Sequence, residues 1–219
     1  MRILIVTATE MEVAPLVAAF HHTAERRGNL TSHTHAAHDV DVLVTGVGMV
    51  PTAALCAHAL ALNAYDLALN FGVCGSFDPA LPPGAVVHVV ADRIAELGAE
   101  DDETFLTIAE LNLPGDYEFF NDDPPANQAL RELPAVRAIS VNTVHGNART
   151  IAEVTARFNP QVESMEGAAF MCACRIGGVQ FAQVRAVSNI VEQRNRGAWQ
   201  LAEAIGSLSR AALAILDRA

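Results

Sequence analysis

The sequence predicts an α/β fold with a largely parallel sheet. Short apolar runs of strand length alternate with longer runs of helical periodicity, a pattern typical of helices that cover a mostly parallel sheet. Polar motifs accompany two of the apolar runs, at 162–169 and at 184–189, and strand-to-helix junctions are where α/β proteins hold ligands. The 219 residues fit a single domain, 1–219, with a large core.

The N-terminal elements begin with a buried strand over 2–7, where every position up to Thr7 except Arg2 is apolar. A helix over 12–20 follows, because Pro15 is tolerated only in the first turn of a helix. A hairpin over 29–45 comes next, with its turn near His38 and Asp39.

The central elements alternate between glycine-rich segments and apolar runs. The Gly-Val-Gly segment 46–48 predicts a tight turn; it is not a dinucleotide fingerprint, because Pro51 stands where the third glycine belongs. A helix over 50–62, rich in alanine and leucine, leads to a strand over 66–71 and a glycine-rich loop over 72–75. Another strand is expected over 85–95.

The acidic, proline-punctuated segment 97–127 is the least regular part of the chain. Such a segment suits a lid or a contact with a partner, and no secondary structure is assigned to it. Periodic patterns resume after it and predict, in order, strand 136–143, helix 147–158, helix 166–177, strand 180–187 and helix 197–217.

The composition excludes several classes of function. A net charge of -11 disfavours binding to nucleic acid, which needs clustered basic residues. All 14 basic residues are arginine, so a lysine Schiff base and a Walker-type phosphate loop are excluded. No apolar run reaches the roughly 18 residues of a membrane span, and no signal peptide pattern is present. A cytoplasmic protein without a membrane partner is therefore expected.

The cysteine and histidine residues give no metal or redox motif. Cys56, Cys74, Cys172 and Cys174 lack C-x-x-C spacing and lie in apolar runs, where cysteine behaves as a small hydrophobe. His33, His35 and His38 alternate on the expected hairpin without cysteine or glutamate ligands nearby. We expect these histidines to lie on a solvated face.

Several polar residues near strand ends have two interpretations. Thr9 and Glu12 have the spacing of a capping box, but Glu12 also lies near the carboxyl end of the first strand. Glu166 suits the first turn of a helix, where a carboxylate complements the helix dipole. Arg185 suits a surface ion pair, and Ser188 with the next residue suits a turn or helix cap. The alternative interpretation places all of them in one polar pocket.

A family resemblance favours the pocket. Segments 3–12, 162–169 and 184–189 together resemble the purine nucleoside phosphorylase and nucleosidase superfamily, and segments 96–101 and 113–117 are similar to its futalosine hydrolase branch. The resemblance implies a three-layer α/β/α sandwich around a central mixed, largely parallel sheet. It also implies a homo-oligomer with sites near subunit interfaces, no metal or organic cofactor, and a small-molecule purine nucleoside as substrate.

The resemblance further implies individual roles. Glu12 would activate the attacking water, Glu166 would bind the ribose 2′- and 3′-hydroxyls, and Met165 would pack on the sugar. Asn189 stands where the adenine-cleaving relatives have an aspartate that protonates the purine. The remaining residues expected to bind substrate are Gly75, Val144, Arg185 and Ser188.

The asparagine decides the expected substrate. An amide is no Brønsted acid but donates to purine N7 while its other end pairs with a 6-oxopurine edge, which points to hypoxanthine or guanine rather than adenine. The resemblance to the futalosine hydrolase branch implies hydrolysis of futalosine, an inosine-like nucleoside with a 5′ carboxyphenyl ketone, in menaquinone biosynthesis. The arginines open to binding its carboxylate are Arg93, Arg149, Arg194 and Arg196.

Three alternatives stay open at this point. A nucleoside phosphorylase would need basic residues around phosphate, whereas the N-terminal loop offers Glu10 and Glu12. A methylthioadenosine or adenosylhomocysteine nucleosidase is disfavoured by Asn189. A purine-binding or storage relative without catalysis is disfavoured by the two intact glutamates, Glu12 and Glu166.

Overall fold

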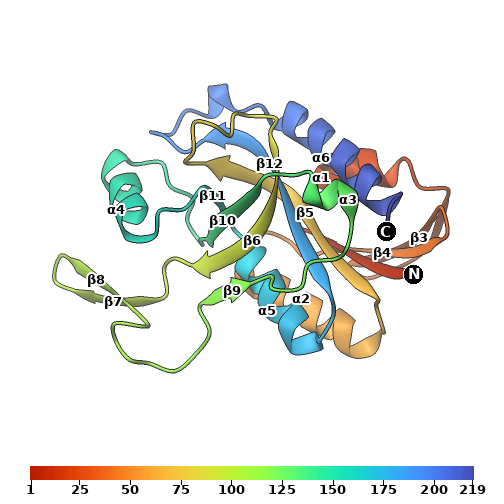
Figure 1. The fold of residues 1–219 in the computed structure, drawn as a ribbon, viewed down its shortest axis with the longest axis horizontal. Coiled ribbons are helices and arrows are strands. Elements are labelled where there is room, and N and C mark those ends of the chain that lie inside the picture. Colours follow the sequence, from red (N-terminus) through yellow and green to blue (C-terminus); the bar gives the residue numbers. More distant parts are fainter.

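The computed structural model describes the backbone of residues 1–219 and the side chains of 1–21 and 26–219. A mixed sheet runs through the molecule with helices on both faces, and both chain termini lie at the same end (Figure 1). The elements in chain order are β1 (Arg2–Thr7), α1 (Glu10–Val17), β2 (His22–Arg27), β3 (Leu30–His35), β4 (His38–Val44), α2 (Met49–Leu62), β5 (Leu67–Ser76), β6 (Val86–Ile94), β7 (Gly98–Asp101), β8 (Thr104–Thr107), β9 (Glu118–Phe120), α3 (Gln128–Arg131), β10 (Ala135–Ser140), α4 (Ala148–Phe158), β11 (Val162–Ser164), α5 (Gly167–Gly177), β12 (Phe181–Ile190), the 3-10 turn Arg196–Ala198 and α6 (Leu201–Leu216).

The sheet has the order β11–β10–β6–β12–β5–β1–β4–β3–β2. Its centre is parallel along β4–β1–β5–β12 and along β6–β10–β11, and β12 meets β6 antiparallel. The short strand β11 also pairs antiparallel with β5, with Glu163 opposite Gly75, so this part of the sheet closes on itself. The α/β class with a central mixed, largely parallel sheet is thereby confirmed.

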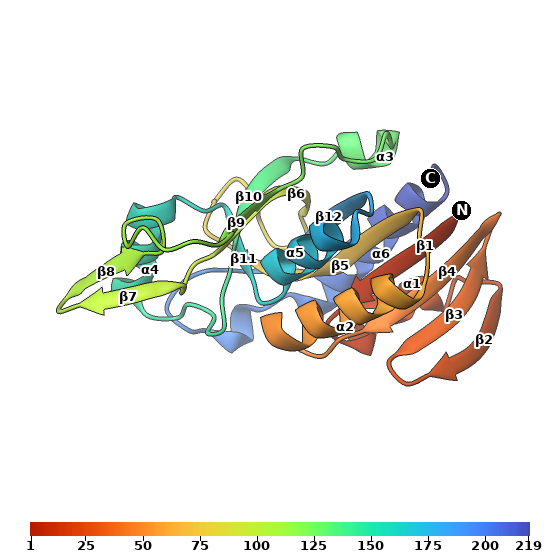
Figure 2. The ribbon, with the colours of Figure 1, turned by 90° about the horizontal axis from the view of Figure 1, so that it is seen from below.

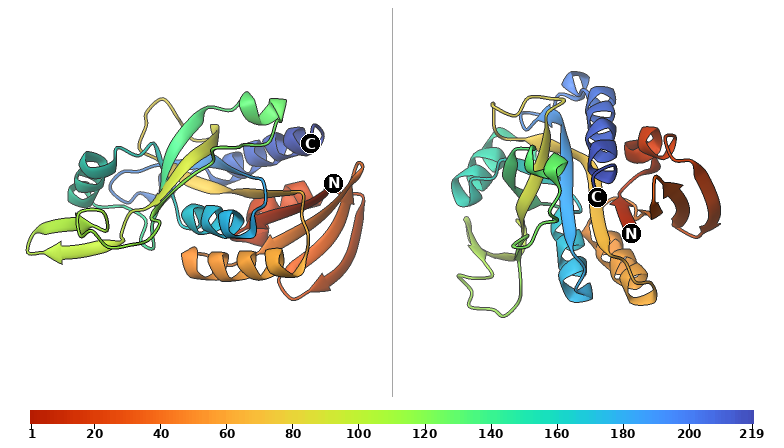
Figure 3. Two further views of the ribbon diagram at one scale, coloured as in Figure 1. Left: turned by 60° about the horizontal axis from the view of Figure 1, so that its bottom comes forward. Right: turned by 45° about the vertical axis from the view of Figure 1, so that its right-hand side comes forward.

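Helices cover the two faces of the sheet as separate layers (Figures 2 and 3). On one face α2 and α5 pack on the sheet around Phe170, Phe181 and Met171. On the other face α1, α3 and α6 bury a second cluster that includes Phe71 and Leu208. The three-layer α/β/α arrangement follows from these two cores.

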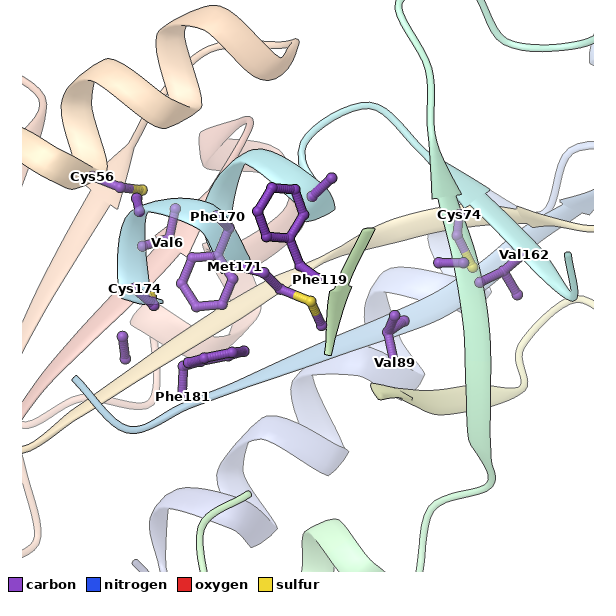
Figure 4. Close-up of a cluster of buried hydrophobic side chains, with 14 of the residues drawn as sticks. Val6, Cys56, Cys74, Val89, Phe119, Val162, Phe170, Met171, Cys174 and Phe181 are labelled. Carbon is purple, nitrogen blue, oxygen red and sulfur yellow. The ribbon is translucent and has the colours of Figure 1, made fainter. Parts of the chain in front are cut away.

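The cysteines belong to the first core. Cys56 and Cys174 lie among its apolar side chains, beside Phe170 and Phe181, whose rings meet edge to face at 5.9 Å (Figure 4). All four cysteines are free, and burial raises the pKa of Cys56 and Cys74 to about 12. A thiol with so high a pKa is an inert packing group, which is the role that the sequence indicates.

The N-terminal region differs from the prediction in two ways. Helix α1 begins at Glu10 rather than at residue 12, so Pro15 lies inside the helix and not in its first turn. The earlier start follows from the capping interaction between Thr9 and Glu12. The hairpin turns at Ala36, whose φ is +50°, two residues before the expected turn, and strand β2 precedes it.

Two of the three hairpin histidines, His33 and His35, are buried, so the prediction of a solvated face was wrong for them, whereas His38 is half-buried. His33 and His35 are 4% and 8% exposed and lie 5.5 and 5.3 Å from the ring of Phe20. His35 also contacts the Asp217 carboxylate at 2.7 Å. Alternation along a strand separates its two faces but does not tell which face is buried. Here the face that carries His33 and His35 packs on Phe20, which follows α1.

Two further segments are more regular than the sequence indicates. The acidic segment holds the projecting β7–β8 hairpin as well as β9, which pairs with β6 (Figure 1). The glycine-rich stretch 72–75 belongs to β5 and is not a loop. Its glycines allow close approach: a Cβ at Gly72 would lie 2.8 Å from Arg185 Nη1, and one at Gly75 would lie 2.9 Å from Val191 Cγ2.

Candidate active site

A cavity of about 280 Å³ opens at the carboxyl ends of the parallel strands. It brings together seven of the eight residues expected in the site from segments far apart in the sequence: Glu12, Gly75, Val144, Met165, Glu166, Ser188 and Asn189. Arg185 is not among the residues that line it. A cavity of this size holds a small molecule.

Glu12 is held from both sides and faces the cavity. Its Oε2 accepts from the Thr9 backbone N–H and hydroxyl, both at 2.9 Å, and from Thr7 Oγ1 at 3.3 Å. Its Oε1 accepts from the Val73 N–H at 3.0 Å. Both interpretations of Glu12 therefore hold: it caps α1, and it presents a carboxylate to the cavity.

Glu166 is the N-cap residue of α5, and its carboxylate crosses to another loop. Its Oε1 accepts from the Gly48 N–H at 3.0 Å. Gly48 has a φ of +106°, a conformation that favours glycine, so the Gly-Val-Gly segment is the tight turn that the sequence predicts. Burial raises the pKa of Glu166, while Arg185 and the Gly48 N–H oppose the rise.

Arg185 lies behind the cavity wall, between the two carboxylates. Its side chain is 1% exposed and donates to Asn70 Oδ1. A Cβ placed at Gly72 would meet both its Nη1, at 2.8 Å, and Glu12 Oε1, at 3.0 Å. The guanidinium therefore balances the charge of Glu12 and Glu166 from within the protein, and its geometry is that of a positioning residue.

A buried polar network fixes the start of α5. Ser140 Oγ donates to Asp92 Oδ1 at 2.9 Å and accepts from the Ala168 N–H at 2.8 Å. Gln183 Nε2 donates to the other oxygen of Asp92 at 2.9 Å, and burial raises the pKa of this carboxyl to about 6. Gly167 lies directly above, where a Cβ would come within 2.0 Å of Asp92 Oδ2.

Asn189 lies in β12, which continues three residues beyond the predicted end. Its Oδ1 accepts from Ser188 Oγ at 2.8 Å, and its Nδ2 donates to the Ile190 carbonyl at 3.0 Å. An amide nitrogen carries two hydrogens, so one N–H is left for a ligand. The carbonyl oxygen of Asn189 has two lone pairs, and the Ser188 hydroxyl uses one of them.

The structure adds two residues that the sequence analysis missed. Glu163 lines the cavity at 3% exposure and is bonded to His145. Its signal was present in the 162–169 motif, but Glu166 was the carboxylate that matched the family pattern. Trp199 also lines the cavity, and as a lone tryptophan after a turn it carried no periodic signal.

The four candidate arginines separate by their contacts. Arg93 is paired with Glu118, and Arg149 pairs with Glu153 on the exposed side of α4. Arg194 places its guanidinium 5.8 Å from the ring centroid of Trp199. The backbone carbonyl of Arg196 accepts from the N–H of Trp199 at 3.3 Å.

Among the described residues, no group of three histidine, cysteine, aspartate or glutamate side chains is arranged to hold a metal ion. None of the helices described is both long enough and apolar enough to cross a membrane.

Comparisons with known proteins agree with this geometry. Residues 2–218 match the family described as the phosphorylase superfamily. The chain is 34% identical to futalosine hydrolase of Streptomyces coelicolor, over 96% of this chain and 93% of that protein. It is 32% identical to futalosine hydrolase of Thermus thermophilus, over 80% of each. The solved structure of Helicobacter pylori futalosine hydrolase superposes with a TM-score of 0.85 at 14% identity, covering 100% of this chain and 98% of that one.

Proposed function

Since the chain belongs to the phosphorylase superfamily and, within it, to the futalosine hydrolase family, we propose that it hydrolyses the N-glycosidic bond of futalosine. The products are hypoxanthine and dehypoxanthine futalosine, and the reaction belongs to menaquinone biosynthesis. The observation that carries the proposal is the single cavity that joins Glu12 and Glu166 to Asn189.

The mechanism follows from the charges that develop when the bond breaks. The ribose gains oxocarbenium character and the purine gains negative charge, so the site stabilises opposite charges at its two ends. Glu12 acts as general base toward water. Glu166 accepts hydrogen bonds from the ribose diol and stabilises the positive sugar, and such charge-assisted bonds are the strong ones. The free N–H of Asn189 donates to N7 of the leaving base.

Water rather than phosphate is the expected nucleophile. The described residues that line the cavity include three carboxylates, Glu12, Glu163 and Glu166, and no basic side chain. The guanidinium of Arg185 is already hydrogen-bonded behind the wall. A phosphate anion would therefore meet carboxylates without a cation to neutralise it.

We assign the substrate's remote carboxylate to Arg194. Among the described side chains it makes no ion pair, and it lies over Trp199, which lines the cavity. An aromatic carboxylate can stack on an indole while its charge pairs with a guanidinium, and leaving that charge unpaired on burial would cost several kcal/mol. Arg194→Met should raise KM for futalosine and leave KM for inosine, which lacks the carboxylate, unchanged. Equal changes for both nucleosides would withdraw the assignment.

Turnover assays test the proposed reaction. The protein is incubated with futalosine, inosine and methylthioadenosine, with and without phosphate, and the released base and sugar are identified by chromatography. We expect hypoxanthine from futalosine, independent of phosphate. Phosphate-dependent release would indicate a phosphorylase, preference for methylthioadenosine would indicate the adenine-releasing class, and binding without turnover would indicate a storage protein.

We also propose that the chain is cytoplasmic and forms a homo-oligomer. Val50 on α2 and Ile176 on α5 are 78% and 79% exposed, and these helices cover the same face of the sheet. Exposed large apolar side chains on one face suit contact with a second copy. Light scattering after gel filtration tests this, and Ile176→Glu should lower the molar mass if the face is an interface.

A further inference from the structure

Glu163 is a buried carboxylate that lines the cavity and has no role in the proposed hydrolysis. It lies on β11 opposite Gly75 of β5. Its Oε1 accepts from the His145 N–H at 3.0 Å, and its Oε2 lies 2.6 Å from His145 Nδ1. A carboxylate has about four acceptor positions, so each oxygen keeps one for a ligand.

Glu163 and Asn189 lie at the same end of the cavity. A Cβ built on Gly75 would lie 3.3 Å from Asn189 Nδ2 and 3.5 Å from Glu163 Cγ, so both groups flank one point on β5. A ligand that meets the N–H of Asn189 therefore has the Glu163 carboxylate near its neighbouring edge.

Asn189 cannot distinguish the two purine classes by itself. Its free N–H donates equally well to N7 of hypoxanthine and to N7 of adenine. Its carbonyl oxygen cannot pair with O6, because both groups are acceptors, so the expectation that this end reads the 6-oxopurine edge fails and N1–H needs another acceptor. Hypoxanthine carries a hydrogen on N1, where adenine carries a lone pair, so an acceptor that faces N1 favours hypoxanthine.

We propose that Glu163 is the residue that selects a 6-oxopurine, by accepting a hydrogen bond from N1–H of the base. This inference rests on the proposed function and adds the group that determines its base specificity. The same carboxylate faces the N1 lone pair of an adenine and repels it. Asn189 then holds N7, and the base is bound on both sides of O6.

His145 is the positioning residue for this carboxylate. It contacts the Glu163 carboxylate through its backbone N–H and its ring. Its loop is bound from outside the cavity by Glu96, which accepts from the Asn142 and Thr143 N–H groups at 2.8 and 3.2 Å. The Nδ1 contact requires a ring hydrogen on that nitrogen if the carboxylate is ionised. An asparagine at 145 would keep a donor near this place, whereas alanine would remove it.

The test compares Glu163→Gln with Glu96→Gln. The substrates are futalosine and its 6-amino counterpart with the same 5′ substituent, and binding of free hypoxanthine and adenine is measured by calorimetry. We expect Glu163→Gln to lower the 6-oxo to 6-amino ratio of kcat/KM by about 10- to 100-fold, because an amide N–H can face the adenine N1. Glu96→Gln removes a charge from the same loop outside the cavity and should leave the ratio unchanged.

Equal losses on both bases in Glu163→Gln would overturn the proposal, since they indicate a structural role. If that variant does not fold, His145→Ala should lower the ratio and His145→Asn should restore it; an unchanged ratio in His145→Ala overturns the proposal. A wild type that binds hypoxanthine through Glu163 but does not hydrolyse futalosine would contradict the proposed function and not this inference.

Discussion

Substitution of Glu12 by glutamine tests the general base in its own hydrogen-bond setting. The carboxylate accepts from the Val73 N–H on one side and from the Thr9 N–H on the other. Glutamine offers one acceptor and one donor end, so in either orientation its amide N–H meets a backbone N–H. The Thr9 and Thr7 hydroxyls can turn to accept, which favours the amide nitrogen on their side.

Two separate magnitudes follow from this setting. One backbone donor left without a partner lowers the free energy of unfolding by about 1 to 3 kcal/mol. Loss of a general base lowers kcat by about 10² to 10⁴, which corresponds to about 3 to 5.5 kcal/mol in the activation barrier. Substrate binding depends on other groups, so the dissociation constant for futalosine should stay close to that of the wild type.

The assay separates the two effects. Single-turnover rates give the chemical step, and urea denaturation gives the free energy of unfolding. Glu10→Gln is the matched control, because Glu10 lies on the same helix, is exposed, and pairs only with Arg26 among the described side chains. That control should keep full activity. Turnover of Glu12→Gln near the wild-type value, with stability lowered, would reduce Glu12 to a helix cap and refute the reasoning.

Four further predictions follow from the same network. Glu166→Gln should reduce kcat/KM more for ribosides than for 2′-deoxyribosides, because only ribosides offer both hydroxyls; equal losses contradict the diol assignment. Asn189→Asp should raise the yield of adenine relative to hypoxanthine in competition assays, and an unchanged ratio removes Asn189 from base recognition. Gly167→Ala should destabilise the fold by several kcal/mol through the 2.0 Å clash with Asp92, whereas Gly206→Ala on α6, 3.5 Å from its nearest atom, should be neutral or stabilising in thermal melts. Burial raises the pKa of Asp92 from 3.8 to about 6, so its contribution to stability is full below pH 4 and falls by about 3 kcal/mol as pH rises through 6. In urea titrations, the difference in free energy of unfolding between Asp92→Asn and the wild type should therefore shift in favour of the variant by about 1.5 kcal/mol between pH 5 and 7.5. A difference that stays constant with pH would contradict the raised pKa.

The residues that the sequence could locate are those whose chemistry stands beside a strand end. Glu12 and Glu166 follow recognisable apolar runs, and the carboxyl ends of parallel strands meet at one edge. Their meeting in one cavity was therefore predictable. The extent of a single domain over 1–219 remains a prediction, and one cooperative unfolding transition would support it.

The residues that could not be located depend on contacts made in three dimensions. Gly72 and Gly75 indicated a loop by composition, but they lie in β5, where they pair with β12, and Arg185 and Val191 occupy the space of their missing side chains. His33 alternates as a solvated residue would, yet its face packs on Phe20. Sequence periodicity assigns residues to the two faces of a strand, but it does not tell which face is covered by other parts of the protein.

The positions of Arg185 and Glu163 in the site likewise could not be predicted from local sequence patterns. A strand-end arginine was expected to touch the substrate, whereas its side chain turns inward to Asn70. Glu163 precedes the residues that match the family pattern, and its place in the cavity follows from the pairing of β11 with β5. That pairing joins segments about 90 residues apart, which a local pattern does not report.

The double pairing of β11 also fixes one wall of the site. This strand has only three residues, Val162–Ser164, but it is bonded to β10 on one side and to β5 on the other. Detaching it breaks two ladders together, so its amide hydrogens should exchange with solvent only through unfolding of the surrounding sheet. The wall that carries Glu163 and leads into Glu166 is thus rigid before any nucleoside arrives, so we expect any motion that admits substrate in other segments that line the cavity, such as that of Trp199.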